Sequence, residues 1–596
     1  MRNIYPFGKA PFVILIIAII SGLTYGGMKW RRNSAERPEL ILVFQAEIHE
    51  ELYKKAAEEF GKKHNCTVKL QRVQKEVLMD RLQSAMQTGC EVPDVVELLE
   101  GTIGYFTRGK LENVGLVDLT DRLRAEGFLD ESKMVQKRYA LWSSRGHIFA
   151  IPHDVHPAGL CYRADLVMRL RKELKERYNY DFDVTQLTTW DKFVDAGKVI
   201  SGRHPDHPEI PGEWEFTDES LGIRKGAKRY MIDMADDSMI SLIILMTQRG
   251  FDLFDANGNV AFDRPEVAEL IAWFVHQTRG IDRIAFPAGD GQNFYQAMKE
   301  GLDLFYFTPD WRTMQFTFDL AFQDEDPNKT PSILKGQLAL MKMPVWADKD
   351  GNRLTFVDGD GKVQESFQTG TWGGSGLAIT KHCKDQNLAW EFAKYLYLEA
   401  SDEDFLNRFQ KTNIVPPVKK AWTIRDVPVK DKDGKPVLDE NGKPKLAGFF
   451  DKSPYFKEIV RSKETGDLEV VPISIGEFYA SQADFTPPHF STAYTSQAET
   501  QLLNVYYTAR DFYETEIRKA GKNPSRETLK KIDDEMLALI KRKLTENSLY
   551  IKRLIDRNVF LKDGVVTADA KSSADAASPA ETAAAPATEP EEKQEQ

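Results

Sequence analysis

The chain has 596 residues and a formal net charge of −11, from 80 Lys and Arg against 91 Asp and Glu. Seven acids and two lysines lie between Thr567 and Gln596, so the rest of the chain carries only −6. The composition excludes a collagen, a coiled coil, a multi-span membrane protein and a disulfide scaffold, and the length predicts two or more lobes. A nearly neutral body without a long basic run indicates no nucleic-acid partner.

The two ends of the chain differ from the body in composition. Residues 1–37 include 19 uncharged residues between Lys9 and Lys29, about long enough to cross a bilayer as a helix. We interpret this segment as an uncleaved signal anchor and linker, with a cleaved signal peptide as the alternative. Residues 566–596 are rich in Ala, Pro and Glu and contain no aromatic residue, which predicts a disordered acidic tail.

The four cysteines, Cys66, Cys90, Cys161 and Cys383, form no CxxC pair and no cluster with zinc spacing. A Cys66–Cys90 disulfide is possible in an oxidising compartment. Buried free thiols are the simpler interpretation. The sequence therefore predicts no structural metal site.

The first elements alternate between strand and helix. Residues 40–44 form an apolar run typical of a buried strand, and an amphipathic helix follows with Leu52, Ala56 and Phe60 on one face. Two further strands, at 66–73 and 92–99, flank a helical pattern at 77–86. This order predicts a parallel, doubly wound sheet, in which ligands bind at the carboxyl ends of the strands.

The later elements continue this α/β pattern. Thr189 is a good N-cap for a helix that starts at Trp190. The expected helices and strands beyond it are helices at 238–247 and 265–278, a helix at 294–300 before a strand at 302–307, a strand at 377–380, and helices at 387–398, 497–518 and 525–543.

Two stretches resemble insertions. The segment 346–368 contains Asp-Lys-Asp-Gly and Asp-Gly-Asp-Gly, and 430–445 contains Asp-Gly-Lys-Pro and Asn-Gly-Lys-Pro. Asp-Gly and Asn-Gly between short apolar runs predict hairpins. The carboxylates also suggest calcium, but no stretch has the EF-hand spacing with its terminal Glu.

A series of short motifs in a fixed order resembles the family 1 extracellular solute-binding proteins, the maltose-binding-protein-like substrate receptors of bacterial ABC importers for sugars. The motifs are Phe44-Gln45-Ala46-Glu47, Pro93-Asp94-Val95-Val96, Leu116–Thr120, Ile148–Pro152 running into Leu160–Leu166, Thr189–Phe193, Ala297-Met298 through Trp311, Trp372–Ile379, and Ile414–Pro417. The sequence departs from the family in its two hairpin insertions, its missing lipid-attachment cysteine and its acidic tail. The region 422–479 has no confident counterpart.

The resemblance implies an α/β fold of type II, with two discontinuous lobes and a central ligand cleft. We expect the first lobe to contain 38–155 and 301–345. We expect the second lobe to contain 156–300 and 372–565 with the closing helices, and 346–371 to be an inserted hairpin. The implied partners are a carbohydrate ligand and the permease subunits of an ABC importer, with no cofactor. The implied location is the periplasmic side of the cytoplasmic membrane.

Sugar binding needs flat apolar faces and polar groups that pair with hydroxyls. The residues that match the cleft of the family follow the strands and the crossings between lobes. These candidates are Gln45, Glu47, Glu97, Glu100, Asp154, His156, Asp310, Trp311, Trp372, Gly373, Gly374 and Tyr494, with Phe490 as a weaker one. Each candidate also has an alternative interpretation without a ligand. The tryptophans could be core residues, Glu47 and Glu97 could be solvated loop charges, and His156 could be a packing residue at the hinge.

Other function classes also remain open. The acidic candidates would suit a cationic ligand, such as a polyamine or a metal ion, as well as hydroxyl groups. No HExxH, Gly-x-Ser-x-Gly or Walker motif indicates an enzyme, although paired carboxylates for glycoside hydrolysis leave no linear signature. A ligand sensor is disfavoured because no kinase or HAMP-like region follows the body.

Overall fold

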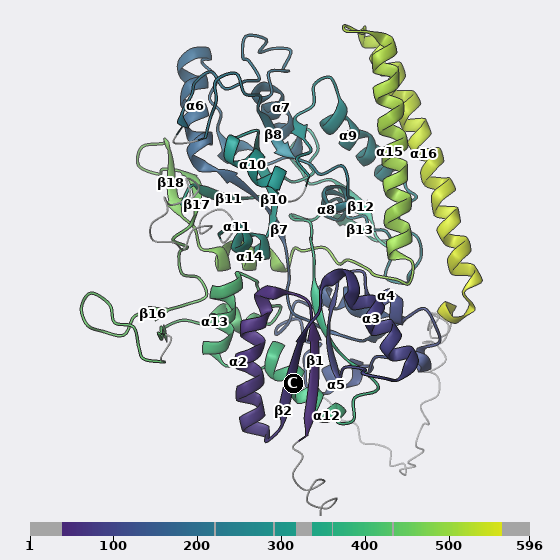
Figure 1. Cartoon of the computed structure of the whole chain (residues 1–596). Helices are drawn as coiled ribbons and strands as arrows, with labels where there is room; N and C mark the ends of the chain where they lie inside the picture. Colours follow the sequence, from purple (N-terminus) through teal and green to yellow (C-terminus); the bar gives the residue numbers. More distant parts are fainter. Residues whose placement is uncertain are drawn as a thin grey trace, which may run out of the picture.

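The computed structural model describes residues 38–219, 222–289, 292–317, 336–359, 361–431 and 434–562. The expected anchor and the expected acidic tail lie outside these residues. Within the described ranges, we find no helix with both the length and the apolar character that crossing a membrane requires. The chain forms two α/β lobes, each built on its own sheet, which Figure 1 shows one above the other.

The first lobe contains a five-stranded sheet in the order β2-β1-β3-β14-β6. Strand β1 pairs in parallel with β2 and β3, as the strand–helix alternation predicts, and β14 is antiparallel to β3 and β6. The elements of this lobe are β1 (Glu39–Phe44), α2 (Glu47–His64), β2 (Thr67–Arg72), α3 (Lys75–Thr88), β3 (Val95–Leu99), α4 (Ile103–Phe106), α5 (Thr120–Ala125), β4 (Ser143–Ser144), β5 (His147–Ile148), β6 (Ile151–Pro152), β14 (Ser375–Ile379), α12 (Gln386–Tyr397) and α13 (Asp402–Thr412).

The second lobe contains a seven-stranded sheet in the order β18-β17-β11-β7-β10-β8-β9. Its elements are β7 (Ala158–Arg163), α6 (Ala164–Tyr178), α7 (Trp190–Ile200), β8 (Tyr230–Asp233), α8 (Ile240–Arg249), α9 (Pro265–Arg279), β9 (Ala285–Phe286), α10 (Gln292–Glu300), β10 (Asp303–Pro309), α11 (Asp310–Phe316), β11 (Leu338–Lys342), β17 (Phe456–Arg461), β18 (Leu468–Pro472) and α14 (Ile475–Ala483). Thr189 caps α7 as expected, because its hydroxyl accepts a hydrogen bond from the N–H of Lys192.

The lobes divide the chain differently from the expected segments. Strands β10 and β11 were expected in the first lobe, but both pair with β7 in the sheet of the second lobe. Strand β14 was expected in the second lobe, but it pairs with β3 in the first. The motif order assigned these strands to the wrong lobe because the sequence of a buried apolar strand is compatible with either sheet. Only the strand with which it pairs shows to which sheet it belongs. The expected 38–155 segment does supply β1, β2, β3 and β6 to the first lobe.

Both predicted hairpins are present. In the first, β12 (Thr355–Val357) pairs with β13 (Val363–Glu365), and Phe356 packs near Phe251 of the second lobe. In the second, β15 (Val427–Pro428) pairs with β16 (Leu446–Ala447) at the base of an arm that projects from the molecule (Figure 1).

The acidic turns of these hairpins use their carboxylates internally. The Asp348 carboxylate accepts hydrogen bonds from the backbone N–H groups of Asp350 and Asn352, and Asp439 does the same with Asn441 and Lys443. Among the described residues, no group of three or more His, Cys, Asp or Glu side chains is arranged to hold a metal ion. The geometry therefore supports turn chemistry over calcium binding at these positions.

The closing helices form a long antiparallel hairpin along one side of the molecule (Figure 1). Helix α15 spans Thr495–Ala520, and α16 spans Arg526–Arg557, so it continues well beyond the predicted end at 543. Ser525 caps α16 by accepting a hydrogen bond from the N–H of Thr528. The hairpin packs against α9 of the second lobe.

The four cysteines are free thiols. Cys66, Cys161 and Cys383 are buried, whereas Cys90 is exposed. The possible Cys66–Cys90 disulfide is therefore absent from this structure. The prediction of buried free thiols is correct for three of the four cysteines and wrong for Cys90.

Candidate functional site

The connections between the lobes meet at a buried network of charged and polar groups. Asp154 lies in the first connection, between β6 and β7, and its Oδ2 accepts hydrogen bonds from the N–H and hydroxyl of Ser375 at 2.8 and 2.9 Å. Ser375 begins β14, directly after the second connection, which comprises residues 366–374 between β13 and β14. Arg138 donates to Asp154 Oδ1 at 3.0 Å, to the carbonyl of Gly373 and to the hydroxyl of Thr371. One guanidinium and one carboxylate thus hold the two connections together.

His156 extends this network into the second lobe. Its Nε2 lies 3.0 Å from Asp154 Oδ2, and its Nδ1 lies 2.5 Å from Asp310 Oδ1. Both ring nitrogens face carboxylates, so the ring is an imidazolium that donates on both sides. Burial opposes this charge, but the carboxylates outweigh it and raise the pKa of His156 to about 9. Burial likewise opposes ionisation of Asp154, but His156 and Arg138 hold its pKa below the usual value.

Asp310 links the network to a third segment of the chain. Its Oδ2 accepts a hydrogen bond from the N–H of Val415 at 2.7 Å, and its Oδ1 accepts one from the N–H of Trp311. The carbonyl of Val415 in turn accepts from the N–H of Val155. Asp154, His156 and Asp310, three of the predicted ligand-binding residues, therefore lie together, and their polar atoms bond to one another, to Arg138 and Ser375, and to the backbone.

Two predicted aromatic residues lie side by side at the edge of this network. The indole N–H of Trp311 donates to the carbonyl of Trp372 at 3.3 Å, and the two rings meet edge to face with centroids 5.3 Å apart. Both side chains are half-buried. The guanidinium of Arg312 lies over the Trp372 ring at 4.7 Å. The pair therefore presents half-buried aromatic surface at the edge of the network.

The two glycines after Trp372 allow close approach of the backbone. Gly373 has a φ of +90°, a conformation that favours glycine. A Cβ on Gly373 would lie 3.3 Å from the Trp311 indole nitrogen and 3.5 Å from the His156 ring. A Cβ on Gly374 would lie 2.7 Å from Leu141 and 2.8 Å from Arg138. A side chain at either position would therefore displace the network or the aromatic pair.

The candidates predicted to follow the first and third strands lie in three different environments, and Glu97 lies within β3 rather than after it. Gln45 is half-buried at the carboxyl end of β1. The Glu47 side chain is 86% exposed and pairs with Arg72. Glu97 is fully buried, and its carboxylate accepts hydrogen bonds from Tyr53 and His49 inside the first lobe. Burial opposes ionisation of Glu97, but His49 and Tyr53 outweigh it and lower the pKa.

Glu100 and Tyr494 contact the C-terminal part of the chain. Glu100 Oε1 lies 3.0 Å from Nε2 of His489, whose Nδ1 lies 3.0 Å from Asp252. The backbone N–H of Glu100 also donates to the carbonyl of Gly374, so this residue lies beside the second connection. The Tyr494 hydroxyl donates to the carbonyl of Leu554 on α16. Tyr494 therefore packs within the C-terminal hairpin and away from the aromatic pair.

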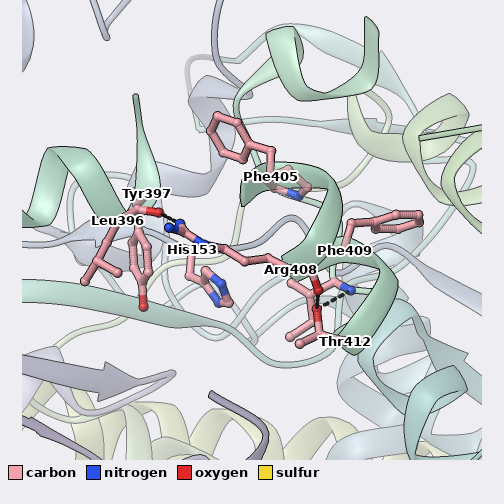
Figure 2. A pocket seen from close by; sticks show the side chains of 9 residues that line it. His153, Leu396, Tyr397, Phe405, Arg408, Phe409 and Thr412 are labelled. Carbon is pink, nitrogen blue, oxygen red and sulfur yellow. Dashed lines mark hydrogen bonds between the residues drawn. The ribbon is translucent and has the colours of Figure 1, made fainter. Parts of the chain in front are cut away.

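A small cavity lies beside the hinge, and Figure 2 shows its lining. It is formed by the end of α12, by α13 and by His153 of the first connection. Its volume is about 20 Å³, which is room for about one water molecule. Burial, with the neighbouring His49 adding to it, lowers the pKa of His153 to about 3, so this ring is neutral at pH 7. A cavity of this size does not accommodate a sugar ring.

Several residues of the site carry no linear signal. Arg138 lies in a short 3₁₀ helix (Gln136–Trp142) far from the motifs, and Asp252 follows α8 in a turn. His489 lies next to Phe490, which the sequence did single out, but a single histidine after two prolines has no recognisable spacing. Each acquires its role only from partners that folding brings to it: Asp154 and Gly373 for Arg138, and Glu100 and Asp252 for His489.

Comparison with known proteins places this architecture. Residues 55–434 match the family described as bacterial extracellular solute-binding protein. The arabinooligosaccharide-binding protein of Halalkalibacterium halodurans is 23% identical over 368 residues, which cover 61% of this chain and 64% of that protein.

Solved structures show the same fold. The GacH receptor of Streptomyces glaucescens, solved unliganded and with acarbose, is 14% identical with a TM-score of 0.52, over 86% of this chain and 99% of its own. The sugar-binding protein MalE of Xanthomonas citri is 13% identical with a TM-score of 0.54, over 87% of this chain and 99% of its own. The fold is therefore the two-lobe α/β fold of these receptors, as the sequence predicts. Because the family match spans more than half of the chain, this protein belongs to the bacterial extracellular solute-binding proteins.

Proposed function

We propose that this protein is the substrate-binding receptor of an ABC importer and that it captures an oligosaccharide between its lobes. The observation that carries the proposal is the Trp311–Trp372 pair, which is half-buried at the junction of the lobes. Stacked or edge-to-face aromatic rings at such a junction offer apolar faces to sugar rings. The ligand named for the Halalkalibacterium relative is also an oligosaccharide.

The proposed contacts fall into two groups. Trp311, Trp372 and the backbone at Gly373 would contact the sugar, and Gln45 and Glu100 would pair with hydroxyl groups. Asp154, His156 and Asp310 would position these residues, because their own polar atoms are already bonded to one another. Glu47, Glu97 and Tyr494 are left out of the contacting set, since the first is solvated and the other two are engaged inside their own lobe or hairpin.

The proposed setting is outside the cytoplasmic membrane, with the N-terminal segment as an anchor and permease subunits as partners. The protein would return its ligand unchanged, as a binding protein rather than an enzyme. Family membership supports the setting, and the apolar stretch before Lys29 supports the anchor.

A thermal-shift screen tests this function, because a ligand that binds the native state raises the Tm. The probes are linear arabino-oligosaccharides and maltose-series oligosaccharides, with spermidine as a cationic comparison. We expect an oligosaccharide to raise the Tm of the wild type in a saturable way. The Tm rise should be lost in Trp311→Ala and partly retained in Trp311→Phe, because phenylalanine keeps an aromatic face.

Three outcomes contradict the proposal. A Tm that rises with spermidine and not with any of the oligosaccharides indicates a receptor for cations. An oligosaccharide-dependent rise that is unchanged in Trp311→Ala removes the aromatic pair from the site. Shortened sugar in the mixture, detected by chromatography, indicates an enzyme.

A further inference from the structure

The segment that leads into the C-terminal hairpin contacts both lobes. Figure 1 shows it passing from α14 to the lower end of α15 at the level where the lobes meet. His489 is buried in this segment, and its ring lies 3.0 Å from Glu100 of the first lobe and 3.0 Å from Asp252 of the second. Thr492 packs so closely on α4 that a Cβ at Gly104 would lie 1.9 Å from its carbonyl oxygen. The segment is therefore held between the lobes.

The hairpin that follows is attached to the second lobe by apolar packing. Helix α9 and the inner faces of α15 and α16 belong to one continuous hydrophobic core. The buried side chains in this seam include Ile271 and Phe274 of α9, Leu502, Val505 and Ala509 of α15, and Met536, Ile540 and Leu544 of α16. Separating this seam would expose a large apolar area to water.

Beyond the contacts of His489 and Thr492, the hairpin itself is attached to the first lobe by hydrogen bonds at the far end of α16. Asn558 donates from its side chain to the carbonyl of Arg108 at 2.9 Å. Arg145 donates to the carbonyl of Phe560 at 2.7 Å and also to carbonyls of the first lobe at Thr107 and Gly109. When such bonds break, their groups exchange one partner for water, so the net cost is far smaller than that of opening an apolar seam.

We propose that residues 484–562 form a strap that moves with the second lobe and releases the first lobe whenever the lobes part. The strap spans the junction of the lobes, and its contacts at Glu100, Arg108 and Arg145 act as a latch that favours the lobe arrangement of this structure, which we call closed. Opening by rotation about the hinge breaks these contacts and leaves the α9 seam intact. The latch operates without ligand, so it does not depend on the proposed function.

The surroundings of His489 support a charged latch. Three acidic groups face it, namely Asp252 after α8, Glu100 after β3 and Glu499 on α15, and Arg138 and His156 lie near Glu100. Burial opposes the charge on the ring, but Asp252 and Glu100 outweigh it and raise the pKa of His489. The bond to Glu100 is therefore charge-assisted and stronger than a neutral hydrogen bond.

Distances between two spin labels in the ligand-free full chain test the latch. Cys90 is a natural exposed site on the first lobe, and Lys172→Cys on α6 provides an exposed site on the second. We expect His489→Gln to raise the ratio of open to closed molecules about tenfold, as expected for the loss of one charge-assisted bond. Asn558→Ala, at the other end of the strap, should shift the population in the same direction.

Two controls separate a latch from general damage. Lys541→Ala changes an exposed residue of α16. It should leave the distance between the labels at Cys90 and at Lys172→Cys unchanged. In a second labelled protein, with Cys90→Ser, Lys172→Cys and Lys541→Cys, the distance between α6 and α16 should stay constant in both latch variants. Unchanged lobe distances in His489→Gln and Asn558→Ala would overturn the proposal. A longer distance between α6 and α16 with unchanged lobe distances would also overturn it, because the hairpin would then separate from the second lobe while the lobes stay closed.

Discussion

Asp154 accepts two hydrogen bonds from Ser375, one from its backbone N–H and one from its hydroxyl, and so joins the first and second connections between the lobes. The same carboxyl group faces Arg138 and His156, and Asp154 is fully buried. The hinge is thus organised around one carboxylate with two cationic partners. Its lobes are joined by a bonded network as well as by the covalent chain.

Removing the charge of Asp154 should destabilise the protein strongly. In Asp154→Asn, the buried Arg138 guanidinium loses its carboxylate partner, and the buried His156 imidazolium keeps only Asp310. Loss of one member of a buried ion network costs about 3–5 kcal/mol of unfolding free energy. Urea unfolding followed by circular dichroism measures it. The control Glu47→Gln, at a solvated carboxylate, should change stability by less than about 0.5 kcal/mol, and an equally small effect for Asp154→Asn contradicts the role of the network.

His156 should make stability fall as the pH rises. Its pKa is raised from 6.5 to about 9 in the folded protein. The stabilisation is therefore complete below pH 6.5, decreases between pH 6.5 and 9 as the unfolded chain loses the proton, and is absent above pH 9. The shift corresponds to roughly 3 kcal/mol.

The measurement is the unfolding free energy of the wild type and of His156→Asn between pH 6 and 10. Asn is chosen because it tolerates the positive φ of 51° at this position. The difference between the two proteins should shrink as the pH rises. A difference that is constant across this range shows that the ring carries no extra proton in the fold.

Gly373 should be needed for ligand binding beyond its effect on stability. In Gly373→Ala, the new Cβ would meet the Trp311 indole at 3.3 Å and the backbone φ of +90° would be strained. Gly442, in the projecting arm, has a φ of +74° with open space around it, so Gly442→Ala carries comparable strain without a neighbour.

Both substitutions should lower the stability by about 1–3 kcal/mol. Only Gly373→Ala should also reduce the Tm rise given by a bound oligosaccharide. Equal ligand responses in the two variants would mean that the backbone at Gly373 does not position the site.

One thiol of the four should react in the native protein. Cys90 is exposed, whereas Cys66, Cys161 and Cys383 are buried. Burial raises the pKa of the Cys383 thiol to about 12 and also raises the pKa values of Cys66 and Cys161, so the reactive thiolate is suppressed at these positions. A thiol reagent such as Ellman's reagent should therefore titrate about one group in the native protein and about four in urea. Rapid reaction of three or four thiols without denaturant would contradict the burial of Cys66, Cys161 and Cys383.

Local patterns in the sequence were sufficient to predict many elements. The apolar run 40–44, the N-cap at Thr189 and the Asp-Gly turns all formed the expected strand, helix and hairpins, because these signals depend on neighbours a few residues away. The motif order also singled out Trp311 and Trp372, whose rings meet edge to face in the structure.

Long-range pairing decided the rest. Strands β10 and β11 joined the second lobe, and β14 joined the first, because registers with β7 and β3 satisfy their backbone groups there, and no local pattern encodes that choice. Arg138 and His489 have no signature of their own and become structural anchors only when folding brings carboxylates to them, Asp154 to Arg138 and both Glu100 and Asp252 to His489. By itself the sequence determined the two-lobe α/β fold and the family resemblance. Only the tertiary structure decided how charge is neutralised at the hinge, because a buried ion is defined by the partners that folding brings to it.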